Sequence, residues 1–183
     1  MKLSKDNKKH FFLSPIKTSG FTLVEMVIYV GILGVTSVLA INAMLTMTSA
    51  YTKLRVSRDL NSSATAVLER VTRNIHEAYE IDIANSTLGT DPGRLTLRTQ
   101  DFAGATTTIE FFVSNNMLRV KEGGVDIGAL QASSTSVSNF VVRSISATNS
   151  TAIKVDLTMS ATRGHANTTR NFFTTTVMRG SYY

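Results

Sequence analysis

Hydrophobic residues follow a different pattern in each of three parts of the chain, and each pattern predicts a different element. Residues 21–47 form an apolar run in which Glu25 is the only charged residue. Residues 60–78 place apolar side chains three and four positions apart, and residues after 93 alternate between apolar and polar. These patterns are typical of a uniformly apolar helix, an amphipathic helix and a series of β-strands.

The apolar run is long enough to cross a membrane. As a helix it would extend about 40 Å, whereas the hydrocarbon layer of a bilayer is about 30 Å thick. An ordinary secretory signal peptide has an apolar region of only about 7–15 residues. Thr48-Ser49-Ala50 is also a poor cleavage site for a signal peptidase. We therefore expect a single membrane-spanning helix.

Basic residues on both sides of the run bear on its orientation. Five lysines precede it, at positions 2, 5, 8, 9 and 17, and three basic residues follow it: Lys53, Arg55 and Arg58. Basic flanks are retained in the cytoplasm. The excess before the run therefore favours a cytoplasmic N-terminus.

The apolar stripe after residue 58 predicts that the helix continues beyond the membrane. The stripe consists of Leu60, Ala64, Val67, Leu68, Val71, Ile75 and Ala78. We expect it to pack on a sheet of the same chain, because Asn61-Ser62-Ser63 interrupts the heptad pattern of a free coiled coil. The helix is expected to stop near Asn85, before the turn residues Gly89 and Asp91-Pro92-Gly93.

Alternation of apolar and polar residues predicts six strands after the helix. They are Arg94–Thr99, Thr106–Val113, Met117–Lys121, Val137–Ile145, Ala152–Met159 and Asn171–Met178. Ser114-Asn115-Asn116 suits a tight turn between two of them, and residues 163–168 are expected to form a loop. The predicted fold class is α+β, with a long N-terminal helix packed on an antiparallel β-sheet head.

The residues at the start of the apolar run form a specific motif. Gly20 is followed by Phe21, Glu25 lies four residues beyond Phe21, and a lysine-rich segment precedes them. With this combination the chain resembles the type IV prepilins and the pseudopilins of type II secretion, closely over residues 16–50. The resemblance implies a pilin-like fold, cleavage by prepilin peptidase between Gly20 and Phe21, and N-methylation of Phe21.

The resemblance also implies a mechanism, partners and a location. Glu25 would lie against the N-terminal amine of a neighbouring subunit during filament assembly. The partners would be prepilin peptidase, membrane lipid, an assembly platform and other pilin or pseudopilin subunits. The chain would cross the bacterial inner membrane once, with its head extracytoplasmic, and then enter a pilus or pseudopilus.

The chain would then have four parts with different roles. They are a removed leader at 1–20, the transmembrane half of the helix at 21–47, its amphipathic half at 48–85 and a β-rich head at 86–183. Many major pilins carry a proline in the apolar helix, and none occurs here between Phe21 and Pro92. A minor pilin or minor pseudopilin is therefore the expected role. The alternative is a signal-anchored cell-surface binding protein that forms no filament and is not cleaved at Gly20.

The formal net charge of +6 comes mainly from the leader. Residues 1–20 contain five lysines and one aspartate, a charge of +4, which leaves +2 on residues 21–183. A nearly neutral mature chain lacks the electrostatic footprint of a nucleic-acid-binding protein, so no direct binding is expected. Adhesive pili, secretion pseudopili and DNA-uptake pili all stay open as the filament system.

Candidate catalytic and metal-binding residues are sparse. On a continuous helix His76 and Glu80 would be one turn apart, which is more typical of a surface pair than of a metal or acid–base site. The sequence contains no zinc-protease, nucleophile-elbow or phosphate-loop motif, so no enzymatic activity is expected. Four aspartates are too widely spaced for a calcium loop: Asp82, Asp91, Asp101 and Asp126. We expect no cofactor, with calcium kept as an alternative because several pseudopilins bind it.

Overall fold

The long N-terminal helix predicted from the sequence is confirmed as α1 (Leu23–Glu77), which contains 55 residues. The computed structural model describes residues 20–101, 103–147 and 150–178, so all of the predicted leader except Gly20 lies outside the described residues. The chain forms two units, residues 1–45 and 46–183, and α1 contributes to both. Its two parts meet different surroundings.

The first unit contains the apolar part of α1. Every residue from 20 to 45 is exposed except Glu25, which is partly buried. The hydroxyl of Thr36 donates to the carbonyl oxygen of Ile32 at 3.0 Å, so it needs no partner outside the helix. Among the described residues, α1 is the one helix long and apolar enough to cross a membrane, although an N-terminal signal sequence has the same properties.

The second unit buries the apolar stripe of α1, as predicted. Six of the seven predicted residues are fully buried: Leu60, Ala64, Val67, Val71, Ile75 and Ala78. Leu68 is partly buried and packs against the same core. Burial of this stripe is favourable at about 25 cal/mol per Å² of apolar surface, so tertiary packing stabilises this part of α1.

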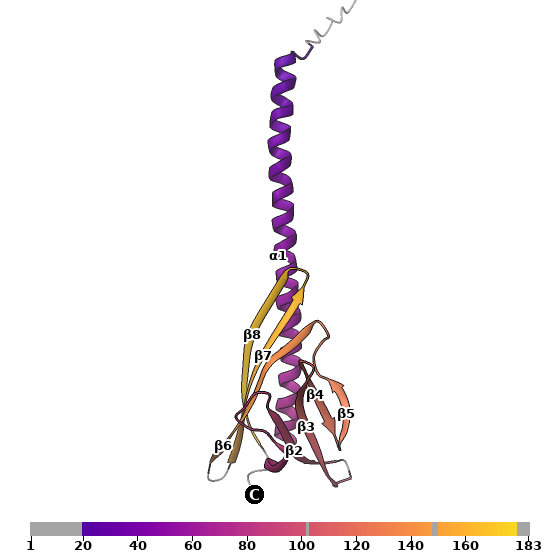
Figure 1. The fold of residues 1–183 in the computed structure, drawn as a ribbon, viewed down its shortest axis with the longest axis vertical. Coiled ribbons are helices and arrows are strands. Elements are labelled where there is room, and N and C mark those ends of the chain that lie inside the picture. The colour runs from indigo at the N-terminus through magenta and orange to yellow at the C-terminus, as the bar shows by residue number, and fades with distance from the viewer. Residues whose placement is uncertain (1–19, 102, 148–149, 179–183) are drawn as a thin grey trace, which may run out of the picture. The chain divides into compact units, whose positions relative to one another are not determined.

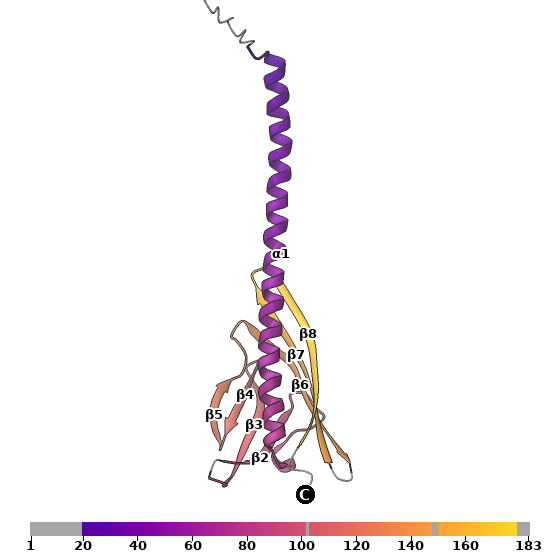
Figure 2. The same ribbon diagram turned by 180° about the vertical axis from the view of Figure 1, so that it is seen from behind.

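Two antiparallel sheets complete the second unit, where a single sheet was expected. Consecutive strands are neighbours in both, in the orders β1-β2-β3-β4-β5 and β6-β7-β8. The strands are β1 (Glu80–Ile81), β2 (Arg94–Gln100), β3 (Thr106–Ser114), β4 (Met117–Glu122), β5 (Val125–Ala129), β6 (Thr135–Ala147), β7 (Ser150–Arg163) and β8 (Ala166–Val177). The C-terminal part of α1 passes behind the strands in Figure 1 and in front of them in Figure 2, and the core contains residues of the helix and of both sheets.

The predicted end of the helix near Asn85 is wrong, because α1 stops at Glu77. Beyond it the backbone pairs with β2 as strand β1, in which Glu80 lies opposite Arg98 and Ile81 opposite Leu97. A short 3-10 helix, η1 (Ile83–Asn85), follows. Tertiary pairing here overrides helix propensity. The predicted helical pair of His76 and Glu80 is therefore also wrong, and Glu80 forms an ion pair with Arg98 at 3.2 Å.

All six predicted strands are present, and the sequence missed β5 as well as the two-residue β1. The tight turn between β3 and β4 is confirmed, since Asn115 and Asn116 have φ values of 53° and 57°, the backbone of a two-residue hairpin turn. The loop predicted at residues 163–168 is wrong except at its turn, because Arg163 ends β7 and β8 begins at Ala166. The hairpin turns at Gly164 and His165, and Asn167 already pairs with Thr162 of β7.

The loop between η1 and β2 joins the two sheets. Gly89 and Gly93 donate backbone hydrogen bonds to the carbonyl oxygens of Val142 and Phe140 in β6, at 2.8 and 2.7 Å. The carboxylate of Asp91 accepts from the backbone N–H of Phe140 at 2.8 Å. A Cβ at Gly93 would lie 2.7 Å from the Phe140 carbonyl oxygen, so only glycine allows this approach. The loop therefore occupies the edge of β6 that β7 leaves open.

Two phenylalanines test the position of the core. Phe111 of β3 is fully buried, whereas Phe173 of β8 is 75% exposed. We expect Phe111→Ala to lower the free energy of unfolding by about 3–5 kcal/mol, through lost burial and the cavity left behind. The matched change Phe173→Ala should alter it by about 0.5 kcal/mol or less. Urea unfolding of the full-length chain in detergent measures both, and equal losses would contradict the described packing.

Candidate functional site

The residues of the N-terminal motif lie around the first turn of α1. Gly20 and Phe21 precede the helix, and Thr22 caps it: the backbone N–H of Glu25 donates to the Thr22 hydroxyl at 3.2 Å. The N–H of Met26 donates to the Thr22 carbonyl oxygen at 3.1 Å, which closes the first turn. A threonine here satisfies N–H groups that a helix start otherwise leaves without partners. The motif therefore places Phe21 just outside the helix and Glu25 within its first turn.

The backbone at Gly20 is accessible. Gly20 and Phe21 are both exposed, and no atom lies within 4 Å of the position that a Cβ on Gly20 would occupy. A protease needs an extended, uncovered segment around the bond that it cuts. On the described side of the predicted cut, Gly20 and Phe21 are uncovered.

Glu25 interacts with a residue that the sequence analysis did not single out. The hydroxyl of Tyr29 donates to Glu25 Oε1 at 3.1 Å. The Tyr29 ring also packs edge-on against Phe21, with ring centroids 5.8 Å apart and planes at 73°. Phe21, Glu25 and Tyr29 follow one another at four-residue spacing, the spacing of neighbours on one helix face. That spacing was the available signal for Tyr29.

The position of Glu25 also suits its charge. It is the acidic residue of the first turn of α1. Peptide dipoles give the N-terminal end of a helix a partial positive charge, which stabilises a nearby carboxylate. Thr22, Tyr29 and the helix end therefore all act on Glu25 from its own chain.

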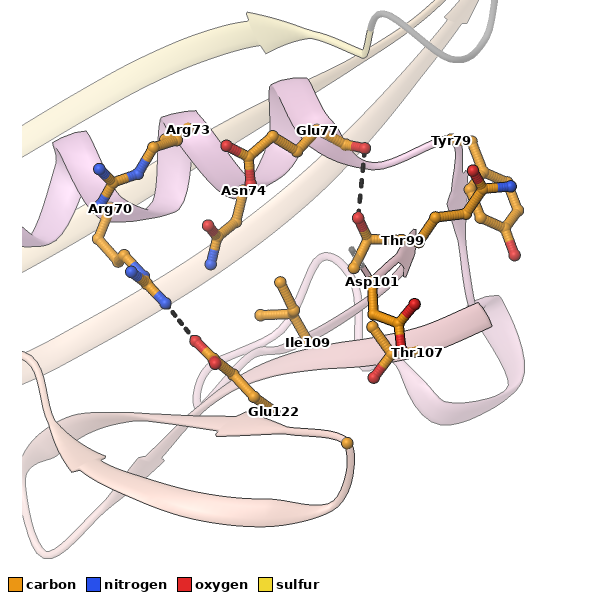
Figure 3. A pocket seen from close by; sticks show the side chains of 12 residues that line it. Arg70, Arg73, Asn74, Glu77, Tyr79, Thr99, Asp101, Thr107, Ile109 and Glu122 are labelled. Atoms are coloured by element: carbon orange, nitrogen blue, oxygen red, sulfur yellow. Dashed lines mark hydrogen bonds and ion pairs between the residues drawn. The ribbon is translucent and has the colours of Figure 1, made fainter. Parts of the chain in front are cut away.

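A polar groove lies elsewhere, between α1 and the first sheet in the second unit (Figure 3). It has a volume of about 920 Å³ and is lined by Arg70, Arg73, Asn74, Glu77, Tyr79, Thr99, Gln100, Asp101, Thr107, Ile109, Glu122 and Gly123. Arg70 of α1 forms an ion pair with Glu122 of β4 across the groove. The lining carries both arginine and carboxylate side chains, so its charge favours no single class of ligand.

Asn74 is the most buried polar side chain of this groove. It is 2% exposed, and its Nδ2 has no hydrogen-bond partner among the described residues. Figure 3 shows its amide directed from α1 towards Ile109 and the Arg70–Glu122 pair. Buried donors of this kind are commonly satisfied by an ordered water. The groove therefore fits a hydrated seam between helix and sheet.

The four aspartates considered as calcium ligands all accept hydrogen bonds from other groups of the chain. Asp91 and Asp101 accept hydrogen bonds from backbone N–H groups, and Asp82 caps η1. Asp126 accepts from Arg119 at 2.9 Å and from a backbone N–H at 3.0 Å. Across residues 20–101, 103–147 and 150–178, no three His, Asp or Glu side chains lie close enough together to hold a metal ion.

Asp82 and Arg98 form a pair of charges in which each partner shifts the pKa of the other. Hydrogen bonding from the Asn85 side chain lowers the pKa of Asp82; burial opposes this effect, and the charge of Arg98 adds to it. Arg98 lies 3.4 Å from Asp82 and 3.2 Å from Glu80. Attraction to these two carboxylates raises the pKa of Arg98, with Glu80 contributing most. The group joins β1, β2 and η1 just beyond the end of α1.

Comparison of the chain with protein-family models, with curated proteins and with solved structures finds no match in any of the three.

Asp82→Asn tests the charge group at the end of α1. The folded-state pKa of Asp82 is below its unfolded value, so its charge stabilises the fold above the usual aspartate pKa of about 3.9. This contribution is lost as the pH falls through the lowered pKa. Urea unfolding should show the wild type more stable than Asp82→Asn near neutral pH, with the difference shrinking as the pH falls below about 3.9.

Asp59→Asn is the matched control, because this carboxylate of α1 is only partly buried and its ion pair with Arg163 is long, at 4.0 Å. Its stability should differ little from that of the wild type at either pH. A pH-independent difference for Asp82→Asn would contradict the electrostatic role of Asp82.

Proposed function

We propose that the chain is a subunit of a bacterial filament of the type IV pilus or type II secretion pseudopilus kind. One observation carries the proposal. The exposed Gly20–Phe21 segment directly precedes a capped helix, and the only charged residue of the apolar part, Glu25, lies in the first turn of that helix. Cleavage after Gly20 would create a new amine at Phe21, one turn from a carboxylate.

Membrane energetics explain why this carboxylate would need a partner. A charged side chain at the centre of a membrane helix costs about 3 kcal/mol or more. Nearer the helix start the cost is smaller, but the residues around Glu25 are apolar and exposed. An amine on a neighbouring subunit would supply the opposite charge, and a pair buried in a dry helix bundle is tolerable only when both members are present.

The proposed mechanism is assembly, not catalysis. Prepilin peptidase removes residues 1–20 and methylates Phe21, while the helix remains in the bacterial inner membrane. Glu25 then attracts the Phe21 amine of an adjacent subunit, which sets the register of the two helices and favours extraction from lipid. A subunit without this pair would leave a carboxylate unpaired in the bundle.

The second unit supports the extracytoplasmic part of the proposal. A helix packed on antiparallel strands is the arrangement that the pilin resemblance implies. The sequence contains no cysteine, and the core of the second unit packs side chains of the helix and of both sheets. The absence of proline between Phe21 and Pro92 favours a minor subunit over a major one.

Processing is the first test of the proposal. The protein recovered from membranes should begin at Phe21, and its mass should include one added methyl group, in cells that contain prepilin peptidase. Cells without the peptidase should yield the uncleaved chain. N-terminal sequencing and intact-mass measurement read both. An uncleaved chain in both strains, or a cut near Ala50, would instead support a signal-anchored or secreted binding protein.

Glu25→Ala tests the assembly step separately. Cleavage after Gly20 should remain normal, because the peptide bond and the Thr22 cap are unchanged. Incorporation into filaments should fall by about two orders of magnitude, the factor expected when one member of a buried ion pair is removed. Sheared filaments and membranes, compared by immunoblot, give the ratio.

Glu69→Ala is the control for this variant. It removes the same side chain from an exposed position of α1 outside the apolar part. It should enter filaments normally. Normal incorporation of Glu25→Ala would exclude the proposed role of Glu25.

A further inference from the structure

We propose that Tyr29 is a positioning residue for Glu25. Its hydroxyl holds one oxygen of the carboxylate and leaves the other oxygen for the amine of a neighbouring subunit. This inference rests on the proposed function, because the amine is the group that Glu25 is positioned to receive. It adds a residue outside the Gly-Phe-x-x-x-Glu motif to the assembly site.

The contacts of Tyr29 connect the two groups of the proposed ion pair. Its hydroxyl donates to Glu25 Oε1 at 3.1 Å, and its ring packs edge-on against Phe21 at 5.8 Å. Edge-to-face packing at this distance is a favoured arrangement of two aromatic rings. Phe21 thus restrains the ring that carries the hydroxyl, and the hydroxyl restrains the carboxylate.

In apolar surroundings, losing the Tyr29–Glu25 hydrogen bond costs more free energy than losing the same bond in water. Glu25 and Tyr29 are the only titratable residues between positions 20 and 45. A hydroxyl or carboxylate without a hydrogen bond costs several kcal/mol in hydrocarbon, where no water replaces the missing partner. Tyr29 and Glu25 each satisfy a polar group of the other. The hydrogen bond therefore lowers the cost of keeping Glu25 in lipid until a neighbouring subunit supplies the opposite charge.

The Glu25 carboxylate has enough acceptor positions to bind a second partner. An ionised carboxylate has two oxygens and about four acceptor positions, and Tyr29 contacts only Oε1. An amine from another subunit can bind Oε2 without displacing the hydroxyl. Because Tyr29 already limits the rotamers of Glu25, less side-chain entropy is lost when the amine binds.

Tyr29→Phe tests the inference, since it removes the hydroxyl and keeps the ring. In isolated membranes, the full-length chain is treated with dicyclohexylcarbodiimide, an apolar reagent that modifies carboxyl groups within membranes. Mass spectrometry of the peptide that contains Glu25 gives the rate of modification. The variant should be modified about tenfold faster, the factor corresponding to loss of one hydrogen bond to a charged group.

Two control variants show whether the change in modification rate is specific to Tyr29 and Glu25. Tyr51→Phe makes the same change at another exposed tyrosine of α1 and should leave the rate unchanged. Glu25→Gln should abolish modification, which identifies the reacting carboxyl. An unchanged modification rate in Tyr29→Phe would overturn the inference, whether or not the variant is incorporated into filaments.

Incorporation into filaments provides the second measurement. Tyr29→Phe should be cleaved normally and enter filaments several-fold less than the wild type. In a Glu25→Gln background the same change should have no further effect, because a residue that acts through Glu25 has nothing left to position. Additive losses, or faster modification with normal incorporation, would also overturn the inference. Failure of cleavage at Gly20 in the wild type would instead overturn the proposed function and remove the role of Tyr29 with it.

Discussion

The structure depends on one helix that meets two different surroundings. Over residues 20–45, α1 exposes apolar side chains on all its faces, a surface that water disfavours. Over its second part the same helix concentrates apolar residues on one stripe and buries it against two sheets. The helix is continuous across this change because its backbone hydrogen bonds are internal. Only the side chains must differ between the two parts.

Periodicity in the sequence was sufficient to predict the elements whose side chains alternate between buried and exposed. The stripe on α1 and the inward residues of β2, β3, β4 and β7 follow from spacing alone, because burial of one face imposes that spacing. The C-terminal end of α1 could not be predicted from periodicity. Glu80 and Ile81 continue a helical pattern, and pairing with Arg98 and Leu97 decides their conformation. Strand β5 was missed because it has only five residues and contains Gly128. Its apolar side chains, Val125 and Ile127, are exposed, so no buried face marks it as a strand.

Only part of the candidate site could be predicted from the sequence. Gly20, Phe21 and Glu25 were identified because their residue types and spacing form a motif. The contact of Tyr29 with both Phe21 and Glu25 depends on side-chain rotamers, which spacing permits but does not determine. The groove containing Asn74 was inaccessible to sequence reasoning for another reason. Its residues come from α1 and from three strands brought together only by folding.

The strand order has a consequence for how the second unit forms. In both sheets every strand pairs with the strand that follows it in the chain. A chain that emerges from its N-terminal end therefore presents each strand immediately before its partner. Strand pairing therefore requires no segment that is distant in the sequence. Because the loops between paired strands are short, the entropy cost of each pairing is low. Unpaired edges are accordingly short-lived during synthesis, and the interval in which a half-formed sheet could associate with another molecule is correspondingly brief.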